Sequence, residues 1–141
     1  TAPFNVRLVL ENSDIKRVEP DISIICDKKK LTEKGCEGSP DLIIEVVSKG
    51  NKMHDYATKV SWYKQAGVEE YWIVDYTKRI VLVYLFNMDE FFEYTFNDTV
   101  NMSIFDGNFS IDFSIIDMSW YVTGIYTINT FTKVIQNDII V

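Results

Sequence analysis

A glutamate lies inside the apolar run Leu42 to Val47, and its setting suggests chemistry. The run has the composition of a strand that is buried on both faces. At a spacing of two residues, the neighbours of Glu45 on its own face are Ile43 and Val47. Burying an ionised carboxylate there carries a large desolvation free energy unless the carboxylate is paired with a cation or binds a metal. A salt bridge to a lysine, or a strand at the edge of a sheet in water, remains an alternative explanation.

A second acid, Asp21, follows Pro20 and opens the apolar run Ile22 to Ile25. Taken alone, a Pro-Asp pair at the start of a strand is typical of a turn. Proline is tolerated near the start of a strand, where a missing hydrogen-bond donor matters least. Asp21 is therefore a candidate functional residue only if its strand lies beside the strand of Glu45.

The elements that must position these acids can be read from the periodicity of the sequence. Apolar residues at helical spacing predict a helix over residues 53–66, with Asn51 as its N-cap and Gly67 just beyond its end. Residues 27–40 are expected to form a loop with one short helical turn, and residues 76–78 a hairpin loop. A helical crossover and a hairpin together predict a mixed sheet. The expected strands cover residues 4–10, 17–26, 41–47, 70–75, 79–86, 91–96, 100–105 and 109–113.

Length, charge and composition narrow the class of protein. The chain has 141 residues, which suits a single domain over 1–141, and it holds no apolar run long enough to span a membrane. The net charge is −7: residues 1–84 carry 13 basic and 13 acidic residues, whereas residues 85–141 carry one lysine and eight acids. Two cysteines and one histidine cannot form a four-ligand zinc site. Two reduced thiols in a cytoplasmic protein are the simplest interpretation.

The order of these features resembles that of a known superfamily. A Pro-Asp on one strand, followed by an acid within the next apolar strand, is the order of the PD-(D/E)XK nucleases. More specifically, the chain resembles the bacterial Uma-type family of restriction-endonuclease-like proteins, from about residue 3 to about residue 117. The tail beyond Asp117 does not match, and we expect an upstream helical segment of the family to be missing. The matching segments are 19–23, 38–48, His54-Asp55-Tyr56, Lys59, Tyr63 and 66–75.

This resemblance implies a fold, a function and a site. The fold is α/β, a restriction-endonuclease-like core with a mixed β-sheet, a packed helix and a β-rich C-terminal extension. The function is Mg²⁺-dependent hydrolysis of DNA, with Mn²⁺ as a substitute for Mg²⁺. Asp21 and Glu45 are the expected metal ligands and catalytic acids, and the carbonyl of Val46 is a further candidate. Val47 stands where the superfamily usually has its lysine, and Lys59 occupies the place of a lysine that has migrated to the helix.

Several alternatives stay open at this point. Lys49 competes with Lys59, which could instead form a surface pair with Asp55. Asp41 and Asp75 are expected to be structural, and Tyr63 to be a core residue whose hydroxyl could reach the site. The lysines at 28–30 and 34 could follow a phosphate backbone or lie in a solvated loop.

A different class of function also remains open. The chain could be a catalytically silent binding module with an acidic, β-rich C-terminal face, because the pI is about 4.6 and no strong basic stripe is present. DNA is the expected partner of an active enzyme, and self-association is left open.

Overall fold

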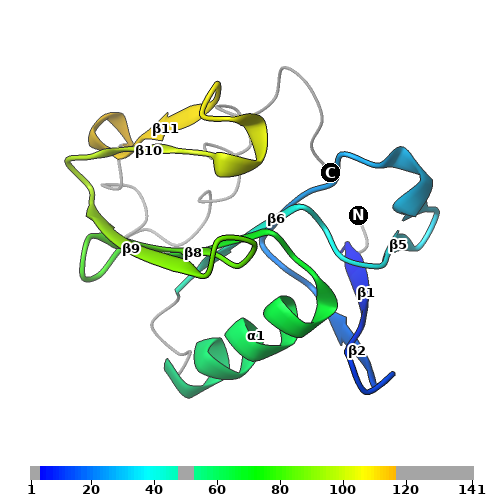
Figure 1. Cartoon of the computed structure of the whole chain (residues 1–141). Coiled ribbons are helices and arrows are strands. Elements are labelled where there is room, and N and C mark those ends of the chain that lie inside the picture. The colour runs from blue at the N-terminus through cyan, green and yellow to red at the C-terminus, as the bar shows by residue number, and fades with distance from the viewer. Residues whose placement is uncertain (1–3, 48–52, 117–141) are drawn as a thin grey trace.

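A mixed five-stranded sheet forms the centre of the fold. The structure, a computed structural model, describes residues 4–47 and 53–116 (Figure 1). The strand order is β3-β6-β7-β8-β9, in which β6 and β7 are parallel and every other neighbouring pair is antiparallel. The predicted mixed sheet is therefore confirmed. The strands are β3 (Ile22–Ile24), β6 (Leu42–Val46), β7 (Glu70–Asp75), β8 (Ile80–Leu85) and β9 (Glu90–Thr95).

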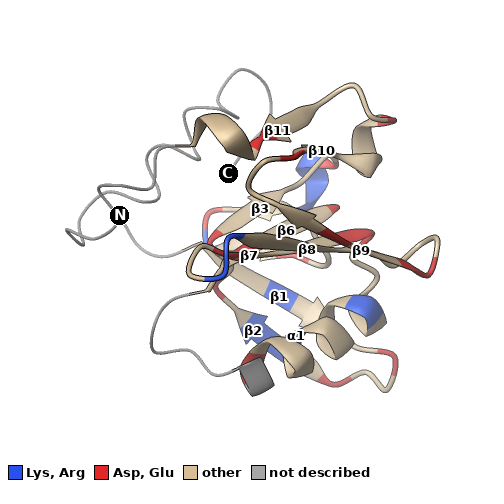
Figure 2. Ribbon diagram, turned by 90° about the vertical axis from the view of Figure 1, so that its left-hand side faces the viewer, with Lys and Arg blue, Asp and Glu red and all other residues tan. Residues whose placement is uncertain are grey.

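Two further layers cover this sheet, one on each face (Figure 2). Helix α1 (Met53–Ala66) lies on one side together with a four-stranded sheet of order β2-β1-β5-β4. The two-stranded sheet β10-β11 lies on the other side. The strands of the outer layers are β1 (Asn5–Val9), β2 (Ile15–Val18), β4 (Leu31–Thr32), β5 (Gly35–Glu37), β10 (Thr99–Asn101) and β11 (Ser110–Asp112). Three short 3₁₀ helices complete the described segments: η1 (Lys28–Lys30), η2 (Ser103–Phe105) and η3 (Phe113–Ile115).

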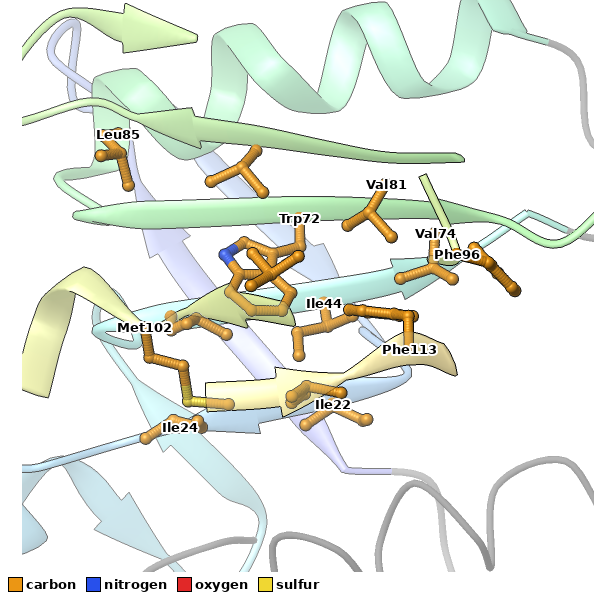
Figure 3. Packing of buried hydrophobic residues seen from close by; sticks show 14 residues of the cluster. Ile22, Ile24, Ile44, Trp72, Val74, Val81, Leu85, Phe96, Met102 and Phe113 are labelled. Carbon is orange, nitrogen blue, oxygen red and sulfur yellow. The ribbon is translucent and has the colours of Figure 1, made fainter. Parts of the chain in front are cut away.

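The first hydrophobic core lies between the central sheet and the C-terminal segment. Trp72 and Ile44 from the sheet pack there with Phe113 and Met102 (Figure 3). Glu70 is fully buried in this layer, where its carboxylate accepts hydrogen bonds from Trp72 Nε1 at 2.6 Å and from the Ile104 backbone N–H at 3.1 Å. Burial raises the pKa of Glu70, and these hydrogen bonds oppose that shift. Glu70 therefore anchors η2 to the sheet.

The second core lies between the opposite face of the sheet, α1 and the small sheet. Tyr56 and Tyr63 of α1 are buried there against Tyr71 and Ile73 of β7. The helix ends as predicted at Gly67, whose φ of 85° is readily adopted only by glycine. The Val68 N–H bonds to the Tyr63 carbonyl, as in a Schellman motif. This core fixes the rotation of α1 about its axis, and hence the residues that it presents to the sheet.

Two expected elements differ from the structure. The single strand expected over 17–26 is divided into β2 and β3, which belong to different sheets, because the chain breaks at Pro20 and Asp21. The loop expected over 27–40 contains η1, as predicted, but also the antiparallel pair β4-β5. A Cβ at Gly35 would overlap the carbonyl oxygen of Asn5, so glycine is required for β5 to pair with β1.

The C-terminal strands are shorter than the sequence suggested. The segment expected as a strand over 100–105 ends at Asn101 and continues into η2, and that over 109–113 ends at Asp112. The expected N-cap Asn51 and the tail beyond residue 116 lie outside the described residues.

Candidate active site

The register between β3 and β6 brings the two predicted acids together. These strands are antiparallel, with Ile22 opposite Ile44 and Ser23 opposite Ile43. Continued by one residue, this register places Asp21 opposite Glu45, and opposite residues of an antiparallel pair share a face. Asp21 is exposed at the bend before β3, and its Oδ2 accepts a hydrogen bond of 2.7 Å from the Val46 backbone N–H. Glu45 contacts α1 through Lys59 and Tyr63, and Asp21 lies beside it, bonded to the backbone of the next residue, Val46.

Glu45 is buried and accepts two hydrogen bonds from α1. Its side chain retains 6% of its exposure, and the Lys59 ammonium lies 2.8 Å from its Oε1. The Tyr63 hydroxyl donates to the same oxygen, also at 2.8 Å. The predicted direction of Lys59 toward this glutamate is confirmed, and so is the reach of the Tyr63 hydroxyl.

Helical spacing explains why Lys59 and Tyr63 meet at one oxygen. Residues four apart lie on the same helix face, one turn above the other. Tyr63 is fully buried, whereas the Lys59 side chain keeps 26% of its exposure and its ammonium lies 5.9 Å from the centre of the Tyr56 ring. Its aliphatic stem can thus run along apolar surface while the charged end reaches the carboxylate.

The electrostatics of the site disfavour an isolated negative charge. Burial raises the pKa of Glu45. The hydrogen bond and the charge of Lys59 lower it, as does the hydrogen bond from Tyr63, and the charge of Asp21 raises it. The net direction is upward, so one lysine does not fully compensate the desolvation and the nearby acid. Burial, and then the charge of Glu45, also raise the pKa of Tyr63, which keeps its hydroxyl protonated as a donor.

The donor set fits a hard divalent cation. Asp21, at the bend before β3, and Glu45, on β6, supply carboxylate oxygens, and each carboxylate is fixed by a hydrogen bond to the protein. Among residues 4–47 and 53–116, no group of three or more histidine, cysteine or acidic side chains is placed to hold a metal. Mg²⁺ commonly binds through one or two carboxylates, keeping several waters and taking substrate phosphate oxygens. The charge of Asp21 raises the pKa of Glu45, a repulsion that a cation between the two would relieve.

Replacing Glu45 by glutamine is expected to remove a loss of stability that the metal-free wild-type chain suffers as the pH rises to neutral. Because the folded state raises the pKa of Glu45, it binds the proton more tightly than the unfolded chain does. The wild-type free energy of unfolding should therefore fall as the pH rises from the unfolded value, about 4.3, through the folded value. Glu45→Gln lacks this loss. Urea unfolding of both proteins at several pH values, with a chelator present, checks the sign. The free energy of unfolding of the variant minus that of wild type should increase from pH 4 to pH 7, and a decrease would contradict the prediction.

The remaining predicted acids are structural. Asp41 lies just before β6, and its Oδ2 accepts a hydrogen bond of 2.7 Å from the Cys26 backbone N–H. Asp75 is buried at the end of β7 and accepts from the backbone N–H groups of Thr77 and Lys78, as expected of a turn anchor.

The structure describes four of the five other lysines that the sequence singled out, those at 28–30 and 34. Lys28 and Lys29 are exposed on η1, whereas the Lys30 ammonium donates to the Ser39 carbonyl at 2.8 Å. Lys34 is exposed as well. Lys49, the competing lysine, lies outside the described residues.

The structure also clarifies the alternatives for Glu45. The salt bridge to a lysine is present, and its lysine is Lys59, so the ion pair and the candidate site share the same residues. An edge strand is excluded, since β6 lies between β3 and β7. Sequence reasoning did not single out Tyr71, which packs edge-on against Tyr63 with ring centroids 4.8 Å apart. Tyr71 lies two residues before Ile73, which is paired with Glu45 on the neighbouring strand. Residues two apart on a strand share a face, so this spacing could have indicated that Tyr71 and Glu45 lie on the same face of the sheet.

Comparisons with known proteins agree with this architecture. The sequence profile of the Uma2 family, described as "Putative restriction endonuclease", matches residues 2–114. The structure resembles a crystal structure described as "a putative nuclease belonging to DUF820" from Anabaena variabilis, with a TM-score of 0.63 and 17% sequence identity. That match covers 81% of this chain, and the chain spans 64% of the length of that structure. No curated protein matches the sequence. The fold is thus restriction-endonuclease-like, and the chain belongs to the Uma2 family of restriction-endonuclease-like proteins.

Proposed function

We propose that the chain is a Mg²⁺-dependent endonuclease that hydrolyses phosphodiester bonds of DNA, with Mn²⁺ as a substitute cofactor. The observation that carries this proposal is the buried Glu45 with the Lys59 ammonium 2.8 Å from its Oε1, next to Val46, whose backbone N–H donates to Asp21. Membership of a nuclease family supports nucleic acid as the partner. A purely structural ion pair would not require the second carboxylate.

Each residue of the site has a role that follows from its contacts. Asp21 and Glu45 would hold the cation, and the carbonyl of Val46, whose N–H donates to Asp21, is a third candidate ligand. When bound, the ion supplies positive charge at the scissile phosphate and lowers the pKa of a coordinated water. Tyr63 holds the Glu45 carboxylate in place, and the Lys59 ammonium can orient the attacking water or stabilise developing negative charge.

The compartment we propose is the cytoplasm. Cys26 and Cys36 are both free, which fits a reducing environment. Among the described residues, no helix combines the length and the apolar character that a membrane crossing needs.

Cleavage of supercoiled plasmid tests the proposed activity directly. We expect nicked and linear products with Mg²⁺ or Mn²⁺ and none with EDTA. The same preparation of Asp21→Asn is the control for contaminating nucleases, because it changes one exposed side chain of the pair. Absence of cleavage by wild type with either metal, over a range of pH and DNA forms, would contradict the proposal.

The acidic C-terminal half should lie away from bound DNA. The residues from 85 onward carry the whole net charge of −7, and carboxylates repel a phosphate backbone. Photo-crosslinking with a probe introduced at Met88 or Phe109, both exposed, should therefore give no DNA adduct. A probe at the exposed Lys28 tests in parallel whether the lysines at 28–30 follow the phosphate backbone. Strong crosslinks from residues 85–113 would show that this surface binds the nucleic acid.

One observation favours a second function, that of a protein-interaction module. Strand β9 is the exposed edge of the central sheet, and Phe91 and Phe92 are 51% and 40% exposed on its two faces. Glu90 and Glu93 lie on the same strand. An exposed edge with aromatic and acidic side chains is suited to pairing with a protein strand rather than with DNA. A catalytically silent chain would retain this module, so absence of cleavage by wild type in the assay above would favour it over the enzyme.

A further inference from the structure

Two buried hydroxyl groups lack a hydrogen-bond partner in the described part of the chain: those of Ser23 and Tyr71. The strand registers place them in one row, because Ser23 lies opposite Ile43 and Ile43 lies opposite Tyr71. Glu45 is two residues from Ile43 along β6 and projects from the same face. Both unpartnered hydroxyls thus lie on the face that carries Glu45.

Tyr71 is the one of the two that can reach the site. It is the diagonal neighbour of Glu45, whose direct partner on β7 is Ile73, and long aromatic side chains span diagonal positions. Its ring contacts that of Tyr63, and the Tyr63 hydroxyl bonds to Glu45. Burial, and next the charge of Glu45, raise the pKa of Tyr71, which is consistent with a hydroxyl beside this carboxylate. Ser23 is too short to make an equivalent contact.

The packing of Tyr71 does not explain its hydroxyl. The ring is fully buried and stacks on Tyr84 and Phe86, with centroids 6.0 and 6.5 Å away. Phenylalanine would make the same ring contacts without burying an unsatisfied polar group. Such a group in a folded protein calls for a partner in some state of the molecule. The neighbouring candidate site offers one, because Mg²⁺ keeps several of its waters when protein carboxylates bind it.

We propose that Tyr71 is a positioning residue of the metal site, whose hydroxyl hydrogen-bonds a water retained by the ion that Asp21 and Glu45 bind. This inference rests on the proposed metal-dependent function. Tyr71 accepts the hydrogen bond from that water, while Tyr63 continues to donate to Glu45. Groups that orient the outer shell of a metal site commonly change metal affinity by about 10- to 100-fold when they are removed.

The test compares Tyr71→Phe with Tyr84→Phe, in which the same atom is removed from the adjacent stacked ring. Calorimetric titration with Mn²⁺ should show affinity weakened about 10-fold in Tyr71→Phe and unchanged in Tyr84→Phe. The melting temperature of metal-free Tyr71→Phe should equal or exceed that of wild type, which separates positioning from folding. Addition of Mg²⁺ should produce a tyrosine difference spectrum in the ultraviolet. Its amplitude should be smaller than that of wild type in Tyr71→Phe and unchanged in Tyr84→Phe.

Three results would overturn the inference, and they have different meanings. If wild type binds Mn²⁺ and Tyr71→Phe binds it equally well, the role of Tyr71 is wrong and the metal site stands. If wild type binds no Mn²⁺, the proposed function fails and the role of Tyr71 fails with it. A lowered melting temperature in metal-free Tyr71→Phe would also overturn the inference, because the hydroxyl would then have a structural partner.

Discussion

Glu45→Gln is expected to abolish both divalent-metal binding and DNA cleavage. The substitution removes the buried negative charge and leaves a neutral amide in nearly the same volume, so that one of the two carboxylates is lost. We expect cleavage to fall by on the order of 10²- to 10³-fold or more, the range found when one group that stabilises transition-state charge is removed. Plasmid nicking with Mn²⁺ and calorimetry on the same samples measure the two effects.

Glu93→Gln is the matched control for this variant. The sheet registers run from Glu45 through Ile73 and Leu82 to Glu93, so the two glutamates lie in one row on one face. Glu93 is exposed at the far edge, three strands away from Glu45. Cleavage and metal affinity should therefore be unchanged in Glu93→Gln. Equal losses in both variants would indicate an effect of net charge and not of the site.

Lys59→Met is expected to lose cleavage while retaining metal binding. Methionine preserves much of the apolar stem but removes the ammonium that lies 2.8 Å from Glu45 Oε1. The metal-free variant should also lose about 2 kcal/mol of stability, because Glu45 remains buried without its cation, although partial exposure of the lysine moderates the effect. Added Mn²⁺ should therefore raise the melting temperature of Lys59→Met more than that of wild type.

Lys49→Met is the paired test of the lysine assignment. Lys49 lies four residues beyond Glu45 in the sequence and outside the described residues. If Lys59 serves the reaction, Lys49→Met should cleave plasmid at the wild-type rate and Lys59→Met should be at least about 100-fold slower. An inactive Lys49→Met together with a fully active Lys59→Met would reverse the assignment.

Much of the site could be predicted because local patterns carried the information. An acid within an apolar strand marks a side chain that needs a partner wherever that strand lies. The helical spacing of Tyr56, Val60 and Tyr63 located α1, and Lys59 beside that face followed from the same period. The turn at Asp75 and the helix end at Gly67 were also local features, and the structure confirms both.

The parts that were not predicted depend on contacts between distant segments. The period of two residues continues across Pro20, so the pattern alone could not show that β2 and β3 belong to different sheets. The pairing of β1 with β5 requires a close approach of the backbone at Gly35, which no local pattern encodes. Tyr71 resembles any aromatic residue of a buried strand until the register places it beside Glu45. The role of Glu70 as an anchor depends on η2, which is 34 residues away in the chain.

The most direct test of the central claim is the anomalous scattering of Mn²⁺ in crystals of the wild-type chain. We predict one Mn²⁺ peak bonded to carboxylate oxygens of both Asp21 and Glu45, at the roughly 2.0–2.2 Å typical of small hard cations on oxygen. The Lys59 ammonium should remain next to Glu45, beside the ion and not between the carboxylates. An intact Glu45–Lys59 ion pair without a peak at these oxygens, at saturating Mn²⁺, would contradict the account and leave Glu45 as a structural residue.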